Sequence, residues 1–298
     1  MKIENSVHIP VLVKEVLEYL NIRPGAKLID ATINGGGHTK AILEKYSDVK
    51  ILGIEWDPVI FENCKLKIEN LSQNLILVND SYVNLKNIVE KYQFEPDGIL
   101  FDLGLSSWHY EKSGRGFSFR KNEILDMRFN PEVEHESAAD IVNKYSENDL
   151  RELISSLGEE QFAGNIAKNI IRTRREKPII MTDELVNIIS QSVPEWYKHR
   201  KIHFATKTFQ ALRVAVNDEL GNVRKGILAA IDVLKPGGRL VVISFQGLED
   251  KIVKEIFKEK TREGIVEFVI KGTVRPTWEE QKTNPRSRSA KMKVVQKI

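Results

Sequence analysis

Short apolar segments alternate with helical segments through the first hundred residues, and this alternation most constrains the fold. We expect buried strands at 26–31, 50–55, 75–79 and 98–102, and helices at 9–20, 38–46, 58–71 and 83–92. Strands that alternate with helices at this spacing predict a parallel, doubly wound α/β sheet.

The alternation stops near residue 107 and resumes about a hundred residues later. Residues 107–213 contain no convincing strand, whereas a long helix at 212–234 leads through a Pro-Gly-Gly turn to a strand at 240–244. With 41% hydrophobic residues in 298, the chain has ample material for a core. We therefore predict one discontinuous α/β domain, 1–107 and 212–298, with an inserted all-helical domain at 108–211.

The composition of the chain limits which classes of function it can have. No apolar run approaches the ~18 residues of a membrane span, and the start lacks a leader pattern, so we expect a cytoplasmic protein without a membrane partner. The single cysteine, Cys64, excludes an internal disulfide and a cysteine-based zinc cluster. His8, His135, His199 and His203 show no metal-ligand spacing, so we expect no catalytic metal.

Basic residues are clustered although the net charge is only +3. The segment 282–298 has six Lys/Arg and no acid, 196–217 has five and no acid, and 168–177 has five. Such clusters can neutralise phosphates, but on charge alone a solvated surface is the simpler interpretation.

Polar residues stand where the expected strands end. These are Asp30, Glu55, the run Asp80-Ser81-Tyr82, and Asp102, and a turn at 34–37 (NGGG) follows the first strand. Ligands bind beyond the carboxyl ends of parallel strands, and a glycine turn lets backbone approach them closely. An acid at the second strand end can accept both ribose hydroxyls of an adenosine. Because no G-x-G-x-x-G is present, S-adenosylmethionine is favoured over a dinucleotide; a structural glycine turn beside a solvated Glu55 stays open.

Seven stretches, in order along the whole chain, resemble a known family. They are 8–12 (HIPVL), 30–38 (DATINGGGH), 97–107 (DGILFDLGLSS), 115–119 with 126–128 (RGFSF, DMR), 209–213 with 216–217 (FQALR, VN), 243–245 with 248–250 (ISF, LED) and 284–290 (NPRSRSA). Together they resemble the bacterial 16S rRNA (cytosine-N4) methyltransferases of the RsmH/MraW family.

The resemblance implies a Rossmann-like S-adenosylmethionine methyltransferase sheet with an inserted helical domain that recognises RNA. It implies methylation of a specific cytidine N4 in the decoding region of 16S rRNA, with that RNA, within the small ribosomal subunit, as partner; a homodimer is left open. The donor contacts it implies are Gly36, Gly37, His38, Glu55, Tyr82, Asp102 and His109.

The chain departs from the family pattern at several positions. The family usually has Gly where Asn34 stands, Asp where Glu55 stands, Pro-Gln at 108–109, where this chain has Trp-His, and His-Ser at 246–247, where it has Gln-Gly. Glu55 keeps the carboxylate, and His109 keeps a hydrogen-bonding group. Of the donor contacts that the resemblance implies, the contact of His109 has the weakest support from the family pattern.

An exocyclic amine is a poor nucleophile, so the site must orient it and accept its hydrogens. Asp102, followed by Leu103-Gly104, is the residue we expect to contact the donor or orient the amine; capping the following turn is the alternative. Methylation at ring carbon would need a thiolate. The only thiol, Cys64, falls in the helix after the second strand, away from the expected base, so carbon methylation is disfavoured.

Residues after the fourth strand are candidates for RNA contact. A target base must leave its stack, and aromatic rings could hold it while arginines bind phosphates. The rings are Trp108, Tyr110, Phe117 and Phe119, and the arginines are Arg115, Arg128, Arg286 and Arg288. Core packing of the rings and ion pairing of the arginines remain alternatives.

Three other functions remain open on these observations. The first is an amine methyltransferase acting on DNA or another RNA, which would share every donor feature. The second is a nicotinamide-dependent oxidoreductase. The third is a non-catalytic RNA-binding protein with an inactive donor pocket, which the departures at Asn34 and 246–247 keep in view.

Overall fold

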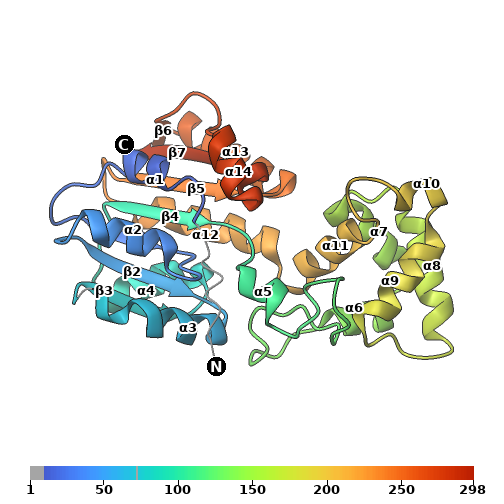
Figure 1. Cartoon of the computed structure of the whole chain (residues 1–298). Coiled ribbons are helices and arrows are strands. Elements are labelled where there is room, and N and C mark those ends of the chain that lie inside the picture. Colours follow the sequence, from blue (N-terminus) through green and yellow to red (C-terminus); the bar gives the residue numbers. More distant parts are fainter. Residues whose placement is uncertain (1–9, 72) are drawn as a thin grey trace. The chain divides into compact units, whose positions relative to one another are not determined.

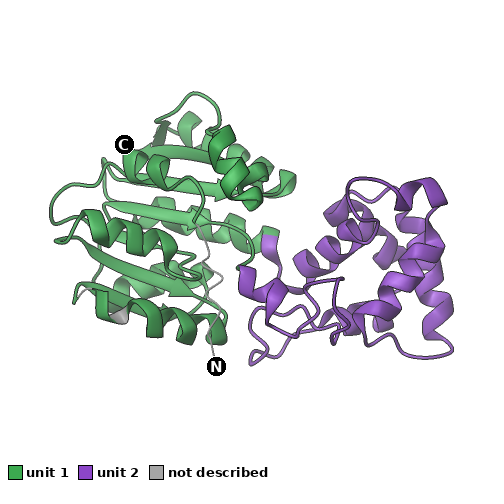
Figure 2. Ribbon diagram, viewed as in Figure 1, with its two compact units in different colours: residues 1–106, 220–298 green, residues 107–219 purple. Residues whose placement is uncertain are grey.

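The computed structural model describes residues 10–71 and 73–298, which form two compact units (Figure 2). Unit 1 comprises the chain up to residue 106 together with 220–298, and unit 2 comprises 107–219. His8 and Ile9, in the first of the matching stretches, lie outside the described residues. No helix in the described ranges has the length and apolarity needed to cross a membrane.

Unit 1 is built on a seven-stranded sheet of order β3-β2-β1-β4-β5-β7-β6. Its strands are β1 (Lys27–Asp30), β2 (Lys50–Glu55), β3 (Leu75–Asn79), β4 (Gly98–Asp102), β5 (Arg239–Ser244), β6 (Val266–Phe268) and β7 (Lys291–Lys297). Strands β1 to β5 pair in parallel, whereas β7 lies antiparallel to both β5 and β6. The Rossmann-like sheet is confirmed, but it is mixed rather than wholly parallel.

Helices cover both faces of this sheet (Figure 1). They are α1 (Val13–Tyr19), α2 (Gly37–Lys45), α3 (Pro58–Ile68), α4 (Leu85–Tyr92), α12 (Glu219–Val233), α13 (Gly247–Arg262) and α14 (Trp278–Thr283), with short 3-10 turns η1 (Glu69–Leu71), η2 (Tyr82–Asn84) and η3 (Pro285–Ser289). In β4, Ile99 and Phe101 pack in the cluster that includes α4, α12 and α13, whereas Leu100 packs with α1 and α2. Burial on both faces explains why the central strands are continuous apolar runs.

The basic C-terminal segment is in part a strand. Lys291 and Lys293 lie on β7, and Lys293 is buried. Both ammonium groups pair with the Asp250 carboxylate of α13, Lys291 at 3.1 Å. Burial opposes ionisation of Asp250, but the two lysines outweigh it and hold its pKa below the usual range. These lysines are therefore engaged within the protein, which corrects the view of the whole segment as a solvated basic tail.

Unit 2 is helical. Its helices are α5 (Ser107–Glu111), α6 (Ala138–Lys144), α7 (Glu147–Gly158), α8 (Ala163–Arg174), α9 (Thr182–Ser192), α10 (Glu195–Lys198) and α11 (Thr206–Val216). A Cβ at Gly158, the end of α7, would lie 2.5 Å from the Lys207 carbonyl oxygen, so α7 and α11 approach closely. Because α11 packs within unit 2, the chain returns to unit 1 at 219/220 rather than at 211/212.

The expected single helix at 212–234 is wrong, because the chain breaks between α11 and α12. Asp218 has a left-handed backbone, with φ of 44°. The Asn217 side chain donates to the Met127 carbonyl at 2.8 Å and accepts the Phe129 amide at 2.8 Å. These contacts, with residues about ninety positions earlier in the chain, stabilise the break.

Candidate active site

Three carboxylates lie at one edge of the sheet in unit 1. Asp30, Glu55 and Asp102 are the last residues of β1, β2 and β4, which are neighbours in the sheet. All three are buried, with exposed fractions of 3%, 9% and 7%. Three acids buried together at the carboxyl ends of parallel strands are costly for stability, which points to a ligand site.

The glycine turn after β1 brings the start of α2 close to these strand ends. Gly36 has φ of 77°, and a Cβ there would lie 2.9 Å from Ile68 Cδ1. A Cβ at Gly37 would lie 3.0 Å from Pro10 Cγ. Asn34 also adopts a left-handed backbone, with φ of 48°, a conformation that Asn tolerates better than most residues. The Asn34 departure from glycine is therefore compatible with the same turn.

Glu55 is held at the end of β2 by two backbone amides. Its Oε2 accepts from the Asn34 N–H at 3.1 Å, and its Oε1 accepts from the Asp57 N–H at 2.9 Å. Burial outweighs these hydrogen bonds and raises the pKa of Glu55 to about 8. Without a ligand this carboxyl is mostly protonated at neutral pH, and hydroxyl donors from a bound ribose would favour its ionised form.

His38, in the first turn of α2, forms a buried ion pair with Asp102. Its Nε2 lies 3.5 Å from Asp102 Oδ2. Burial alone would lower the pKa of His38, but Asp102 and, more weakly, Asp30 and Glu280 outweigh it, so the pKa is raised. The raised pKa favours the charged form of the imidazole beside Asp102.

Two carboxylate oxygens at this edge lack partners among the described residues. Thr39 donates to Asp30 Oδ2 at 2.8 Å, whereas no donor lies in hydrogen-bonding geometry with Asp30 Oδ1 or Asp102 Oδ1. Buried acceptors without donors are rare and are expected where a ligand completes the site. A ligand that carries an ammonium group and ribose hydroxyls would supply hydrogen-bond donors for these oxygens and for Glu55.

The two other residues predicted to contact the methyl donor lie in different units. Tyr82, in η2 after β3, is half-buried, and its ring meets Phe101 of β4 edge-on at 5.3 Å. His109 lies in α5 of unit 2, where its ring is buried 4.8 Å from Phe117 and 5.2 Å from Phe129. The structure therefore brings Tyr82 to the strands of the site, while the donor contact of His109 stays a prediction.

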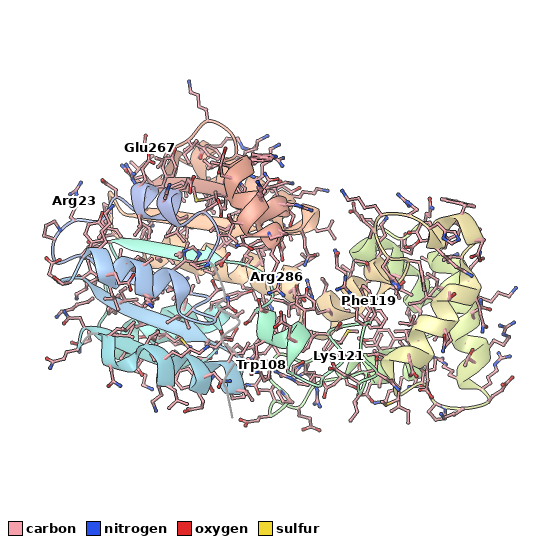
Figure 3. The ribbon with its side chains drawn as sticks, viewed as in Figure 1. Arg23, Trp108, Phe119, Lys121, Glu267 and Arg286 are labelled. Atoms are coloured by element: carbon pink, nitrogen blue, oxygen red, sulfur yellow. The ribbon has the colours of Figure 1, made fainter. Side chains whose placement is uncertain are left out.

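The aromatic residues proposed for base stacking, of which Figure 3 labels Trp108 and Phe119, differ in how deeply they are buried. Phe117 is buried and stacks on Phe129 at 5.7 Å, so it belongs to the core of unit 2. Phe119 stacks on the exposed His203 ring at 4.4 Å. Trp108 is half-buried. Phe117 is thus a structural residue, and Trp108, Phe119 and the exposed Tyr110 remain candidates.

The arginines proposed to bind phosphates also differ, because some bond to groups within the protein and another is exposed. Arg128 forms a bidentate pair with Asp126, at 2.7 and 2.9 Å, and Arg115 donates to the Arg128 and Phe129 carbonyls at 2.8 Å each. Both side chains therefore shape the loop of unit 2. Arg288, in η3 of unit 1, is exposed.

Sequence reasoning missed two threonines that organise the site. Thr39 binds Asp30, and the Thr32 hydroxyl accepts from the Asp102 N–H at 2.6 Å. Thr32 lies within the matching stretch 30–38, and Thr39 directly follows that stretch. Their position in or beside it was the one available signal, since nothing in the spacing predicts which carboxylate or amide they contact.

Cys64 of α3 lies against the glycine turn. Its Sγ would be 3.3 Å from a Cβ at Gly36, and it is buried. Burial raises the pKa of this thiol to about 12, so it stays protonated and is a poor nucleophile. Among the described residues, no group of three or more His, Cys, Asp or Glu side chains could hold a metal ion.

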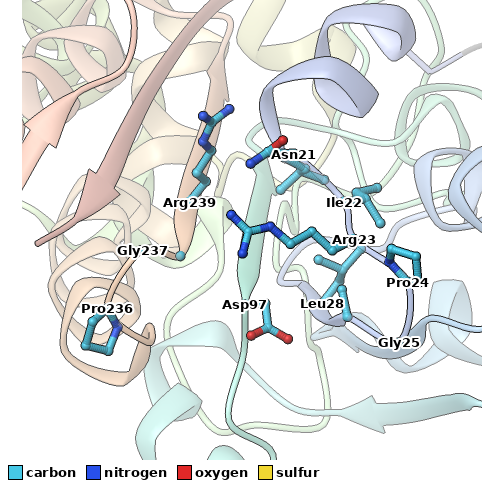
Figure 4. A pocket seen from close by; sticks show the side chains of 13 residues that line it. Asn21, Ile22, Arg23, Pro24, Gly25, Leu28, Asp97, Pro236, Gly237 and Arg239 are labelled. Atoms are coloured by element: carbon cyan, nitrogen blue, oxygen red, sulfur yellow. The ribbon is translucent and has the colours of Figure 1, made fainter.

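A cavity of about 250 Å³ lies at the opposite edge of the sheet (Figure 4). It is lined at the amino ends of β1, β4 and β5 by residues that include Arg23, Asp97 and Arg239. Arg239 donates to the Tyr19 carbonyl at 3.1 Å, and Asp97 accepts from the Lys27 N–H at 2.8 Å. None of the predicted site residues lines it, so it is separate from the candidate active site.

Comparisons with known proteins cover almost the whole chain. A model described as the MraW methylase family matches residues 5–298. A ribosomal RNA small subunit methyltransferase H from Sulfurihydrogenibium sp. (strain YO3AOP1) is 41% identical over 292 residues, covering 98% of this chain and 99% of the relative. One of the same name from Elusimicrobium minutum (strain Pei191) is 43% identical over 298 residues, 99% of each chain.

A solved rRNA methylase from Streptococcus thermophilus superposes with a TM-score of 0.45 at 11% identity, over 96% of this chain and 93% of that one. The sequence matches are much closer, and they extend through both units. They show that the chain belongs to the MraW methylase family and is an S-adenosylmethionine-dependent methyltransferase.

Proposed function

We propose that this chain transfers a methyl group from S-adenosylmethionine to the exocyclic N4 of a specific cytidine in the decoding region of 16S rRNA, within the small ribosomal subunit in the cytoplasm. The observation that carries the proposal is the buried Asp102 carboxylate at the end of β4, with Oδ1 unpartnered beside the His38 imidazole. The names of the relatives support ribosomal RNA of the small subunit as the substrate class.

The donor would be held by the residues gathered at the strand ends. Glu55 accepts hydrogen bonds from ribose hydroxyls, and the turn at Gly36 and Gly37 allows close approach of backbone. Asp30 offers its unpartnered Oδ1 as an acceptor for a cationic ammonium group. The predicted contacts of Tyr82 and His109 complete this set of donor residues.

The bound donor supplies an electrophilic methyl group on a sulfonium. As the N4–methyl bond forms, the sulfur–methyl bond breaks with its electron pair moving to sulfur, and the amine nitrogen must release one proton. Asp102 Oδ1 accepts a hydrogen bond from the amine, which makes the nitrogen more tetrahedral and frees its lone pair, and the same oxygen takes up the released proton. The His38 imidazole lies 3.5 Å from Oδ2 of the same side chain, which leaves Oδ1 as the oxygen available to the amine.

The target base must leave its stack to reach this edge of the sheet. Unit 2 carries candidates for that recognition, including the Phe119 and His203 stack and the acid-free basic segment 196–217. Neutral rings that present a π-face hold unstacked bases, and basic side chains hold phosphates.

The departures at 246–247 do not disturb the local structure. Glu249, in the first turn of α13, accepts from the Phe245 and Gln246 amides at 3.1 Å each, so the helix begins normally at Gly247. A regular start of α13 supports an intact site over an inactive RNA-binding protein.

Mass-spectrometric mapping of small-subunit rRNA from cells with and without the chain tests the proposal. We expect loss of one N4-methylcytidine, restored by the wild-type chain and not by Asp102→Asn. Purified enzyme should methylate small subunits or 16S rRNA but not DNA. An unchanged methylation map, or equal activity on DNA, would contradict the proposed substrate.

A further inference from the structure

Glu280 of α14 is hydrogen-bonded to a residue near the start of the chain. Its Oε1 accepts from the Leu12 N–H at 2.8 Å, across 268 residues of sequence. We propose that Glu280 is a positioning residue for donor binding: it holds Leu12 in a strained turn and thereby keeps Pro10 packed against Gly37 of the glycine turn. This role rests on the donor site of the proposed function, because Gly37 is one of the residues to which we assign donor contact.

Leu12 has a backbone conformation that leucine rarely adopts. Its φ is 57° and its ψ is 35°, in the left-handed region, directly before the regular helix α1. Its side chain is buried in the apolar cluster that also contains Ile42 and Leu43 of α2. A bulky residue keeps such a backbone only where its surroundings enforce it, and strain of this kind gathers at functional sites. The Glu280 carboxylate and the packed side chain enforce it here.

The Glu280 carboxylate is used differently from what its position in α14 predicts. Thr277 caps this helix by accepting from the Glu280 N–H at 3.2 Å. In this Thr-x-x-Glu spacing, the glutamate side chain ordinarily turns back to the N–H of the capping residue. Here Oε1 binds Leu12 instead, while the Glu280 carbonyl accepts from the Asn284 N–H at 2.7 Å. The backbone of Glu280 is therefore held at both ends of α14, and its carboxylate has a fixed position from which to hold Leu12.

Pro10 transmits this restraint to the glycine turn. A Cβ at Gly37 would lie 3.0 Å from Pro10 Cγ and 3.1 Å from its Cβ and Cδ, so the pyrrolidine ring packs directly on Gly37. Val11, between Pro10 and Leu12, is buried in the same apolar cluster as Leu12. Gly37 in turn follows Gly36, whose φ of 77° sets the entry into α2. A shift of Leu12 would therefore withdraw the ring that supports the glycine turn.

The alternative is that the Glu280 bond stabilises the fold without any effect on the donor. Loss of an acceptor for a part-buried amide lowers stability wherever it occurs. Asp97 offers the matched case, because its Oδ2 accepts from the Lys27 N–H, also at 2.8 Å, at the opposite edge of the sheet. Asp97 also pairs with Lys235 at 3.2 Å, so its removal should lower stability at least as much.

Calorimetric binding of S-adenosylmethionine to the full chain, without RNA, separates the two roles. We expect Glu280→Ala to raise the donor Kd about tenfold. Glu280→Gln keeps an acceptor oxygen and should recover most of the affinity, whereas Asp97→Ala should lower stability in denaturant unfolding and leave the Kd unchanged. An unchanged Kd in Glu280→Ala, an equal rise in Asp97→Ala, or Glu280→Gln binding as weakly as Glu280→Ala would overturn the proposal.

A double-mutant cycle tests whether the effect passes through Pro10, and Pro10→Ala also serves if Glu280→Ala folds poorly. Pro10→Ala removes the ring from Gly37 and leaves the Glu280 carboxylate in place, so it should raise the donor Kd by itself. Combined with Glu280→Ala, it should raise the Kd little further, because both changes act through one contact. Combined with Asp97→Ala, it should bind as Pro10→Ala does alone. No effect of Pro10→Ala, or a full product of the Pro10 and Glu280 effects, would overturn the proposed path.

These results are independent of the RNA substrate. Weaker donor binding in Glu280→Ala that Glu280→Gln recovers, in a chain that leaves 16S rRNA unmethylated, would overturn the proposed function and leave the role of Glu280 standing. Methylation of 16S rRNA by the wild type, with an unchanged donor Kd in Glu280→Ala, would do the reverse.

Discussion

The Thr32 hydroxyl accepts a 2.6 Å hydrogen bond from the backbone N–H of Asp102. This bond joins the loop after β1 to the last residue of β4, so two neighbouring strand ends are fixed relative to one another. The Asp102 side chain that we assign to methyl transfer therefore projects from a backbone held on two sides, by the sheet and by Thr32.

Thr32→Val should weaken both stability and activity. It keeps the shape of the side chain but leaves the Asp102 amide without its acceptor, which should cost about 1–3 kcal/mol of unfolding free energy. Denaturant unfolding and single-turnover methylation measure the two effects. Thr32→Ser retains the hydroxyl and should recover most of both; a Val variant equal to wild type would show that water replaces the bond.

Asp102→Asn should lower the rate of methyl transfer by about a hundredfold or more, since a neutral amide is a weaker acceptor for the amine hydrogen. The fold should persist, because the Thr32 bond uses the backbone of residue 102. Single-turnover rates with saturating donor, beside thermal unfolding curves, separate the two effects. A variant with full turnover would remove the catalytic assignment of Asp102.

Glu55 should make stability fall as pH rises. Its pKa is about 8 in the folded chain against an ordinary 4.5, so between these values the unfolded chain is ionised while the folded chain stays protonated. The unfolding free energy should therefore decrease from pH 4.5 to 8, by at most about 4–5 kcal/mol, and level off above. Glu55→Gln should flatten this part of the profile; parallel wild-type and variant profiles would contradict the assignment.

Donor binding should release a proton from the same carboxyl. If ribose hydroxyls donate to Glu55, they favour its ionised form, so near pH 7 binding is accompanied by deprotonation and affinity rises toward pH 8. Calorimetry in buffers of different ionisation enthalpy measures the released proton. Glu55→Gln is the control and should show less release; identical release would place the titrating group elsewhere.

The sequence predicted which acids end neighbouring strands better than it predicted the edges of the fold. Asp30, Glu55 and Asp102 could be placed together because consecutive parallel strands end at the same edge of a sheet. Strand β7 could not be predicted from its composition, because burial of Lys293 requires the Asp250 carboxylate as a partner. No feature of the neighbouring sequence identifies Asp250 as that partner.

The helix break at Asn217 was not predicted for the same reason. Local periodicity continues through 212–234, and the break depends on contacts of the Asn217 side chain with Met127 and Phe129. Thr32 and Thr39 likewise act through partners that only the folded sheet brings near. Long-range hydrogen bonds, rather than weak local propensities, account for what the sequence could not reveal.

Cys64→Ala should retain methyl transfer within about threefold, since the thiol is protonated and serves packing. The lost sulfur leaves a small cavity, so a decrease of about 1 kcal/mol in stability is expected. Disulfide-exchange reagents at pH 8 should react slowly with the native chain and rapidly after unfolding. Abolished activity in a folded Cys64→Ala would revive nucleophilic catalysis and methylation at carbon.

Arg288 and Arg128 should respond differently to the same substitution, because one is exposed and the other is engaged. Arg288→Ala should weaken RNA binding and reduce the slope of log affinity against log salt by about 0.7 to 0.9, the value for one lost phosphate contact. Arg128→Ala should leave that slope unchanged and instead lower the melting temperature, since the guanidinium makes a bidentate pair with Asp126. Filter binding across a salt series and thermal unfolding distinguish the two arginines; a slope change in Arg128→Ala, with none in Arg288→Ala, would reverse their assignment.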